Sequence, residues 1–159
     1  MDSSTITLRP ITRDNFEAIF QLTIAEDQKT FVEANMVSIA EAYVRPTFYP
    51  LAVYADDEVV GFTMYGYEDP PGQWSILQFM IDLRHQRKGH GRQAMQLLIP
   101  VMIEQHGMQE IVLTYFRGND VAARLYRGLG FVETGEVDGG AHMMRLDVHE
   151  WGHPPTQHQ

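Results

Sequence analysis

The sequence of 159 residues contains no cysteine, which excludes disulfide bonds, thiolate metal ligands and a cysteine nucleophile. It has no apolar run near the roughly 20 residues that a membrane-spanning helix needs. Its first residues, MDSSTITLRP, lack the basic and apolar segments of a secretory signal. We therefore expect a cytoplasmic protein with no membrane partner.

Positive charge is scarce, because 12 Lys and Arg stand against 21 Asp and Glu, for a net charge of −9. Such a chain repels a polyphosphate, so no nucleic-acid partner is expected. The imbalance lies in residues 1–80, which hold 4 basic and 12 acidic residues, whereas residues 81–159 hold 8 and 9. An acidic first half can attract a cationic substrate or form an ordinary solvated surface.

The hydrophobic periodicity predicts alternating strands and helices in a single domain over residues 1–148, with a flexible C-terminal tail over 149–159. The class is mixed α/β with one main sheet. Strands are expected at 5–12, 50–56, 58–68, 74–82, 110–116, 131–137 and 141–148. Helices are expected at 13–27, 38–45, 92–107, with a kink at Pro100, and 119–130.

The segment DLRHQRKGHGRQAM, residues 82–95, places basic side chains and two glycines between a strand and a helix. Backbone amides at a helix start hold anions, and glycine lets a ligand approach closely. The P-loop pattern is absent. GHGRQA matches the dinucleotide pattern G-x-G-x-x-A, but a dinucleotide fold needs more strand–helix units than the 68 residues after Gly91 provide. QRKGHG gives a third pattern, Q-x-x-G-x-G, and a plain glycine-rich helix start is the remaining alternative.

A second motif follows, NDVAARLYRGLGF at residues 119–131, which fits N-x-x-A-x-x-L-Y-x-x-x-G-F. With both motifs in this order, the chain resembles the GCN5-related N-acetyltransferase (GNAT) family over about residues 5–147. The resemblance implies a central mixed, mostly antiparallel sheet flanked by helices. It also implies an acetyl-CoA-dependent acyltransferase.

In this family the glycine turn cradles the pyrophosphate of acetyl-CoA, and the strand before it lies along the pantetheine arm. The resemblance makes Tyr126 the general acid that protonates the departing thiolate, and Asn119 a ligand of the cofactor as well as a helix N-cap. The implied cofactor-binding residues are Phe79, Met80, Ile81, Gln86, Arg87, Lys88, Gly89, His90, Gly91, Arg92, Asn119 and Tyr126.

The acceptor amine must lose a proton before it attacks, because an alkylammonium has a pKa of about 10.4. No spacing singles out the base among Glu26, Asp27, Glu33, Glu41, Glu68 and Asp69. We favour Glu33, which lies in the segment that walls the acceptor site in this family, with Gln28 and Phe31 as further substrate-binding residues.

Segments such as VVGFTMYGYED and LQFMIDLRHQRKGHG resemble the bacterial Blt-type spermine/spermidine N-acetyltransferases, and so imply a polyamine acceptor. Another small amine, such as an aminoglycoside or an amino acid, or a protein N-terminus remains an alternative. So does a noncatalytic sensor that binds acyl-CoA or a polyamine. The resemblance also allows a homodimer.

HEWGH at residues 149–153 matches the zinc-protease pattern H-E-x-x-H, which functions only on a helix. Gly152, Pro154 and Pro155 oppose a helix there. We therefore expect no metal cofactor.

Overall fold

The computed structural model describes residues 3–24 and 35–152, and the order of its elements is the one that the sequence predicts. The strands are β1 (Ile6–Pro10), β2 (Phe48–Ala55), β3 (Glu58–Glu68), β4 (Gln73–Ile81), β5 (Glu110–Phe116), β6 (Val132–Asp138) and β7 (Ala141–Asp147). The helices are α1 (Phe16–Phe20), α2 (Asn35–Val44), α3 (His90–His106) and α4 (Asp120–Gly128), with 3-10 turns η2 (Leu83–His85) and η3 (Val148–Glu150).

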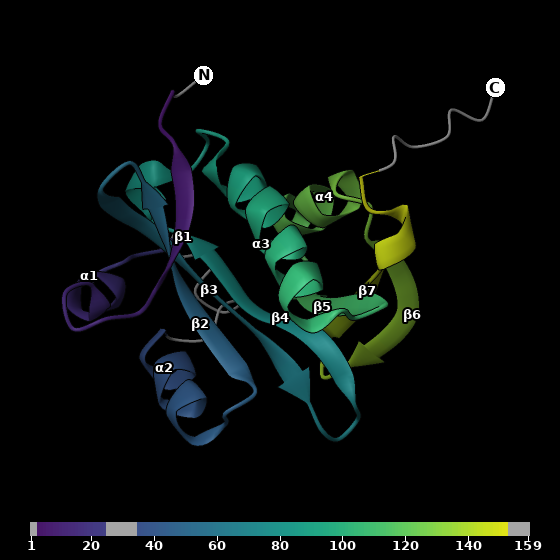
Figure 1. Cartoon of the computed structure of the whole chain (residues 1–159). Helices are drawn as coiled ribbons and strands as arrows, with labels where there is room; N and C mark the ends of the chain where they lie inside the picture. Colours follow the sequence, from purple (N-terminus) through teal and green to yellow (C-terminus); the bar gives the residue numbers. More distant parts are fainter. Residues whose placement is uncertain (1–2, 25–34, 153–159) are drawn as a thin grey trace.

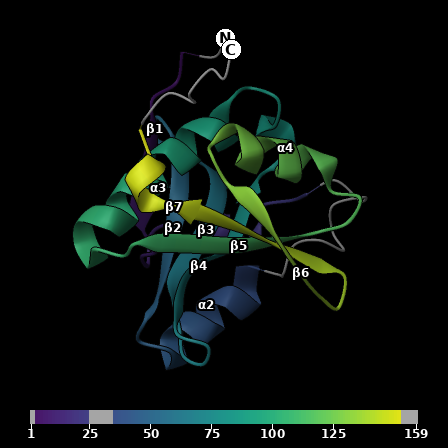
Figure 2. The same cartoon turned by 90° about the vertical axis from the view of Figure 1, so that its right-hand side faces the viewer.

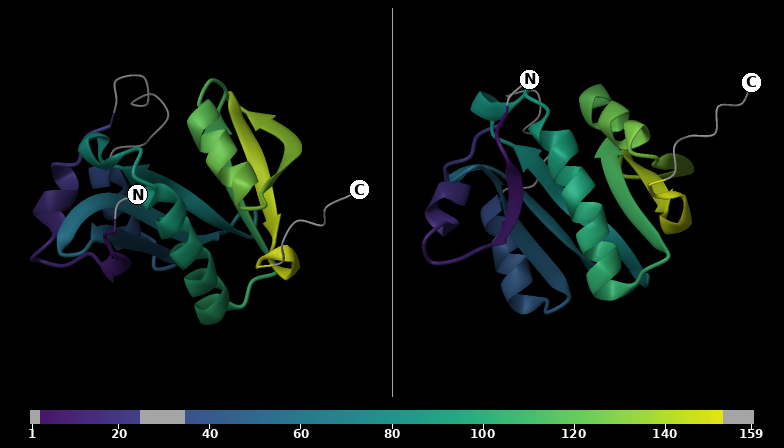
Figure 3. Two further views of the ribbon diagram at one scale, coloured as in Figure 1. Left: turned by 90° about the horizontal axis from the view of Figure 1, so that it is seen from above. Right: turned by 45° about the horizontal axis from the view of Figure 1, so that its top comes forward.

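The strands form one seven-stranded sheet in the order β1-β2-β3-β4-β5-β7-β6. All neighbouring strands are antiparallel except β4 and β5, which are parallel. This confirms the mixed, mostly antiparallel sheet. Figure 3 shows that its two parts, β1–β4 and β5–β7, diverge from each other.

Helices cover both faces of the sheet, with α3 and α4 on one face and α1 and α2 on the other (Figures 1 and 2). Successive strand residues point to opposite faces. Ile81 of β4 therefore joins the cluster under α3, whereas Met80 joins the cluster with Ile19 of α1. The largest cluster lies where α3 and α4 pack on β5 and β7.

The helix predicted over residues 13–27 is wrong in length, because α1 spans only Phe16–Phe20. Thr23 leaves the helical path, since its backbone N–H donates to Asp82 at 2.7 Å and its carbonyl accepts from Leu83 N–H at 2.7 Å. A tertiary contact thus overrides the local apolar pattern. The helix predicted over residues 92–107 is present as α3. It continues through Pro100 and ends at Gly107, which has a left-handed conformation.

The chain after β7 is described as far as Gly152. Trp151 packs against the main apolar cluster, and the Asp147 carboxylate accepts a hydrogen bond from His149 N–H at 2.9 Å. His153, the last residue of the H-E-x-x-H match, lies outside the described residues. Within the described ranges, no helix is long and apolar enough to cross a membrane.

Asp82 ties the end of β4 to the loop after α1. Its side chain is fully buried and accepts hydrogen bonds from the Thr23 backbone N–H at 2.7 Å, the Thr23 hydroxyl at 3.1 Å and Arg84 Nε at 2.9 Å. Burial alone would raise the pKa of this carboxyl, but the hydrogen bonds from Thr23 and Arg84 outweigh it and lower the pKa below the ordinary value of 3.8. The ionised carboxylate therefore stabilises the folded state.

We expect Asp82→Asn to lower the free energy of unfolding at pH 7 by about 1–3 kcal/mol, the usual range for a hydrogen-bonded buried charge. Because the pKa is lower in the folded state, the contribution is complete above the unfolded pKa and is lost as the pH falls through the folded value. The difference between the two proteins should therefore narrow below about pH 4. Denaturant unfolding at pH 7 and pH 3 measures it.

Asp57→Asn is the matched control, because the Asp57 carboxylate is fully exposed and lies 3.6 Å from Arg9. It should change stability little. A gap between Asp82→Asn and the natural protein that stays constant with pH would contradict the assignment.

Candidate active site

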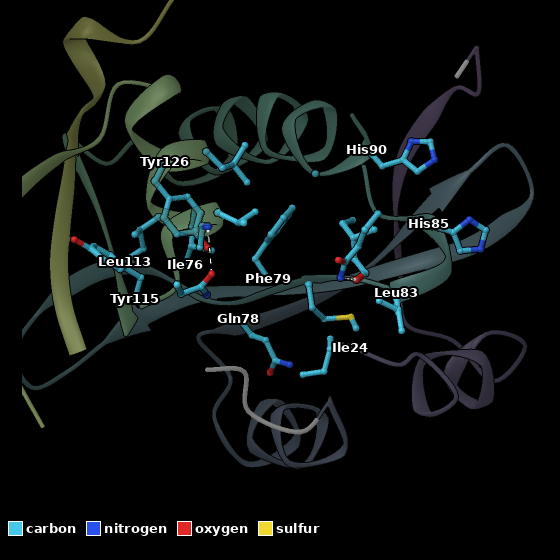
Figure 4. Close-up of a pocket in the computed structure, with 18 of the residues that line it drawn as sticks. Ile24, Ile76, Gln78, Phe79, Leu83, His85, His90, Leu113, Tyr115 and Tyr126 are labelled. Atoms are coloured by element: carbon cyan, nitrogen blue, oxygen red, sulfur yellow. Dashed lines mark hydrogen bonds between the residues drawn. The ribbon is translucent and has the colours of Figure 1, made fainter. Parts of the chain in front are cut away.

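The site is a cleft where β4 and β5 separate. These two described strands pair at a single position, Ser75 with Val112. Beside it, β4 carries a bulge, since Gln78 lies opposite Met64 and Ile76 opposite Tyr65, which leaves Leu77 without a partner in β3. A bulge bends a strand. The cleft beyond it has a volume of about 680 Å³ and is lined by β4, the glycine turn, the start of α3, β5 and α4 (Figure 4).

Alternate peptide groups of β4 point into this cleft. Asp82 N–H donates to the carbonyl of Val60, the residue that continues the β3–β4 register opposite it, at 2.8 Å. Hydrogen-bonded pairs recur at every second residue of an antiparallel ladder. The peptide groups of Phe79 and Ile81 therefore face away from β3, towards β5 and the cleft. The predicted strand Phe79–Met80–Ile81 thus offers hydrogen-bonding groups to an extended ligand.

The glycine turn reaches the same cleft. Gly89 is the left-handed N-cap of α3 with φ 83°, and the first helical hydrogen bond runs from Gln93 N–H to the Gly89 carbonyl at 3.2 Å. The amides of Gly91 and Arg92 precede it and so have no acceptor within the helix. This geometry suits an anion.

Gly91 leaves room for the ligand. A Cβ at this position would meet Phe79, Ile81 and Leu125 at 3.6–3.8 Å, which is ordinary contact. The protein's own packing does not require glycine here.

Gln86 has a more specific position than the motif indicated. Its side-chain Nε2 donates to the carbonyl of Ile81 at 2.9 Å. It therefore caps one of the cleft-facing peptide groups and fixes the turn to the end of β4.

The basic residues of the turn do not all face the cleft. Arg87 lines it, whereas Lys88 lines a neighbouring hollow of about 480 Å³ together with Asp56 and Asp57. Arg92 lies beside α4, with its Nη1 3.2 Å from where a Cβ on Gly128 would stand. Of the twelve predicted cofactor-binding residues, all but Lys88 and Arg92 line the cleft.

The two histidines of the turn are largely enclosed. His90 is buried at the start of α3 and borders both hollows. His85 Nε2 lies 3.3 Å from the Glu58 carboxylate.

Asn119 and Tyr126 form the α4 side of the cleft. The Asn119 side chain accepts from Ala122 N–H at 3.3 Å, which confirms its role as N-cap while it also lines the cleft. Tyr126 is 8% exposed, and burial raises the pKa of its phenol to about 12. Within the described part of the chain, no hydrogen bond to its hydroxyl is found. This phenol stays protonated and can donate into the cleft.

The residues predicted to bind the acceptor amine or to act as its base are not found among the described residues that line the cleft. Gln28, Phe31 and Glu33, like Glu26 and Asp27, lie outside the described residues. Glu41 lies 3.9 Å from Arg45, Glu68 accepts the Ser75 hydroxyl at 2.5 Å, and neither they nor Asp69 line the cleft. No carboxylate is found among the described residues that line it.

Gln78, a buried polar side chain that lines the cleft, was not predicted from the sequence. The signal was present, since Gln78 is the one amide within the apolar run ILQFMI. Asp82, which fixes the turn, follows directly.

Metal ligands are not gathered anywhere in residues 3–24 and 35–152, where no three His, Asp or Glu side chains lie close enough to hold an ion.

Comparisons with known proteins identify the family. The model of the acetyltransferase (GNAT) family matches residues 16–131. The spermine/spermidine N(1)-acetyltransferase of Bacillus subtilis (strain 168) is 32% identical over 139 residues, which are 84% of this chain and 91% of the relative. A probable spermine N(1)-acetyltransferase of Bacillus subtilis subsp. natto is 31% identical over the same shares.

Solved structures share the fold. The spermidine N-acetyltransferase of Vibrio cholerae, in complex with CoA and spermine, superposes with a TM-score of 0.72 at 18% identity, over 91% of this chain and 96% of that one. The PaiA N-acetyltransferase of Thermoplasma acidophilum, in complex with coenzyme A, gives 0.68 at 16% identity, over 90% and 99%. The chain belongs to the GNAT acetyltransferase family and is an acetyl-CoA-dependent N-acetyltransferase.

Proposed function

We propose that this acetyltransferase transfers acetyl to a primary amine of a polyamine such as spermidine or spermine, by direct attack in a ternary complex. The observation that supports it most is the cleft between β4 and β5, which brings strand amides, a helix N-terminus and the Tyr126 phenol together. The curated relatives are named for spermine and spermidine, and the first 80 residues carry an excess of acidic charge that attracts a polycation.

The chain's own groups fit acetyl-CoA. The amides at the start of α3, with Arg87 beside them, would hold the pyrophosphate, and the cleft-facing peptide groups of β4 would pair with the pantetheine amides. Acetyl-CoA supplies a thioester whose carbonyl carbon the amine attacks. A strand N–H that points into the cleft would stabilise the negative charge that develops on the carbonyl oxygen.

Tyr126 is the proposed general acid that protonates the departing sulfur. As the N–C bond forms and the C–S bond breaks, a base takes one proton from the amine nitrogen and the sulfur takes one from the phenol. The phenolate then regains a proton from the protonated base or from solvent, so that the enzyme returns to its starting state. A thiol has a pKa of about 8.5 in water. Burial disfavours every anion, so it raises the pKa of a thiol beside Tyr126 as well as that of the phenol.

Glu33 is our proposal for the base that receives the amine proton, with Gln28 and Phe31 as neighbours of the substrate. The reason is the position of these residues in the sequence between Ile24 and Asn35. Ile24 lines the cleft, and Asn35 accepts a hydrogen bond from Gln78, which also lines it.

Release of the CoA thiol should be measured from acetyl-CoA with spermidine, spermine, putrescine, an aminoglycoside, several amino acids and a peptide. Turnover confined to the polyamines is expected. Turnover on another amine would discard the polyamine proposal and keep the chemistry. Tight acetyl-CoA binding with no turnover would favour the sensor alternative.

Tyr126→Phe should lower kcat by about 10²- to 10⁴-fold, the range for a general acid. Affinity for acetyl-CoA should change little, because the ring remains. Tyr65→Phe is the matched control, since burial also raises the pKa of Tyr65 to about 12, yet its hydroxyl bonds to Gln105 and His106 away from the cleft. Undiminished turnover of Tyr126→Phe would remove the acid role.

Gly91→Ala should weaken acetyl-CoA binding by about tenfold, or about 1.4 kcal/mol, without loss of stability. The reason is that the new methyl group would stand in the cleft without straining the protein. Calorimetry and thermal unfolding measure the two quantities.

Gly107→Ala, at the other end of α3, should show the opposite behaviour. Its φ of 68° disfavours a side chain, so stability should fall, and acetyl-CoA binding should not change. Equal affinities of Gly91→Ala and the natural protein would mean that the turn is misassigned.

A further inference from the structure

Gln78 is a polar side chain fixed at the bulge of β4. It is 5% exposed, its Oε1 accepts the Ser38 hydroxyl of α2, and its Nε2 donates to Asn35 Oδ1 at 2.7 Å. Asn35 Nδ2 in turn donates to the Ile19 carbonyl at 3.1 Å. Helices α1 and α2 thus hold the amide of Gln78 in one orientation.

The cleft passes from one face of the sheet to the other beside this amide. Ile76, Phe79 and Tyr126 line it on the α3 face, whereas Gln78, Met80 and Ile24 line it on the α2 face. Figure 4 shows Phe79 and Tyr126 on one side of the β4 ribbon, and Gln78 and Ile24 on the other. If acetyl-CoA lies against the glycine turn and α4, the α2 side remains for the acceptor amine.

A neutral amide at this place suits the chemistry of an attacking amine. A carboxylate within about 4–6 Å would favour the ammonium form, which has no lone pair and cannot attack until a base has taken its proton. An amide oxygen has two lone pairs, so it can accept the Ser38 hydroxyl and an amine N–H at the same time, and it takes no proton.

We propose that the Gln78 amide, oriented by Ser38 and Asn35, accepts a hydrogen bond from the attacking amine and positions it. This proposal rests on the proposed function, because it needs an amine acceptor. Gln78 is then a residue that determines the amine's placement, while the proton passes to another group.

The first test replaces Gln78 by methionine, whose side chain has a similar length. It has no amide oxygen to accept a hydrogen bond and no N–H group to donate one. The substrate is whichever amine the unmodified enzyme acetylates best in the panel. We expect kcat/KM for the amine to fall about five- to tenfold, the equivalent of one lost hydrogen bond. Calorimetric affinity for acetyl-CoA should stay within twofold.

Two further variants separate this role from simple loss of packing. Ser38→Ala/Gln78→Met removes both partners of the buried hydrogen bond, and should recover stability without recovering kcat/KM. Thr63→Val is the matched control, because the buried Thr63 hydroxyl donates to the main-chain carbonyl of Gln78 at 2.8 Å and does not line the cleft. It should lower stability and leave kcat/KM for the amine unchanged.

Gln78→Glu tests the importance of neutrality. A carboxylate still accepts the Ser38 hydroxyl but favours the ammonium, so the acidic limb of the pH profile of kcat/KM should move to higher pH. A limb that moves to lower pH would show that this position can act as a base, and would overturn the proposal. So would an unchanged kcat/KM in Gln78→Met. Absence of turnover by the unmodified enzyme would instead count against the proposed function. In that case, the affinity for spermidine in the presence of CoA would be compared between the unmodified enzyme and Gln78→Met. Equal affinities would overturn the proposal that Gln78 positions the amine.

Discussion

The separation of β4 from β5 beyond Ser75 and Val112 is the constraint on which the rest of the site depends. Buried peptide groups need hydrogen-bond partners. Those of Phe79 and Ile81 face the space that a continuous sheet would give to β5, and the Ile81 carbonyl accepts a hydrogen bond from the side chain of Gln86. An extended ligand with amide groups satisfies this need in the way that an added strand does. The bulge at Leu77 occurs where this separation begins, so one irregularity both bends β4 and exposes its edge.

The acidic net charge of the chain and an anion-binding turn are compatible because electrostatic effects are local. At physiological ionic strength, charges in water are screened beyond about 8 Å. The amides at the start of α3 and the guanidinium of Arg87 line the cleft, where no Asp or Glu is found among the described residues, whereas Asp56, Asp57 and Glu58 line the neighbouring hollow together with Lys88. The turn is held in place by Asp82, whose buried carboxylate bonds to Thr23 and Arg84. A buried negative charge that accepts three hydrogen bonds therefore positions a turn whose amides suit another negative charge.

The parts of this site that follow from local sequence were predictable, and the parts that follow from register were not. The segments 86–91 and 119–131 each contain a complete structural unit, namely a glycine turn at a helix start and a capped helix with Tyr126 on its inner face. By contrast, α1 ends early because Thr23 bonds to a residue 59 positions away. Gln78 becomes part of the cleft because a bulge in β4 and the position of α2 determine which way it points. Such facts depend on how distant elements pack, which a periodic pattern does not record.

The described residues that line the cleft are neutral or basic. This property affects both the attacking amine and the proton donor for the leaving sulfur. In the proposed mechanism, acetyl transfer needs an amine without its extra proton and a phenol that keeps its proton until the sulfur leaves. Burial penalises charged forms of both kinds, so it favours the neutral amine and the protonated Tyr126 together. A carboxylate in the described walls would favour the ammonium until a base took its proton. The fixed amide of Gln78 provides hydrogen-bonding capacity on the α2 side without that charge. The same low-charge environment thus suits both the proposed nucleophile and the proposed leaving group.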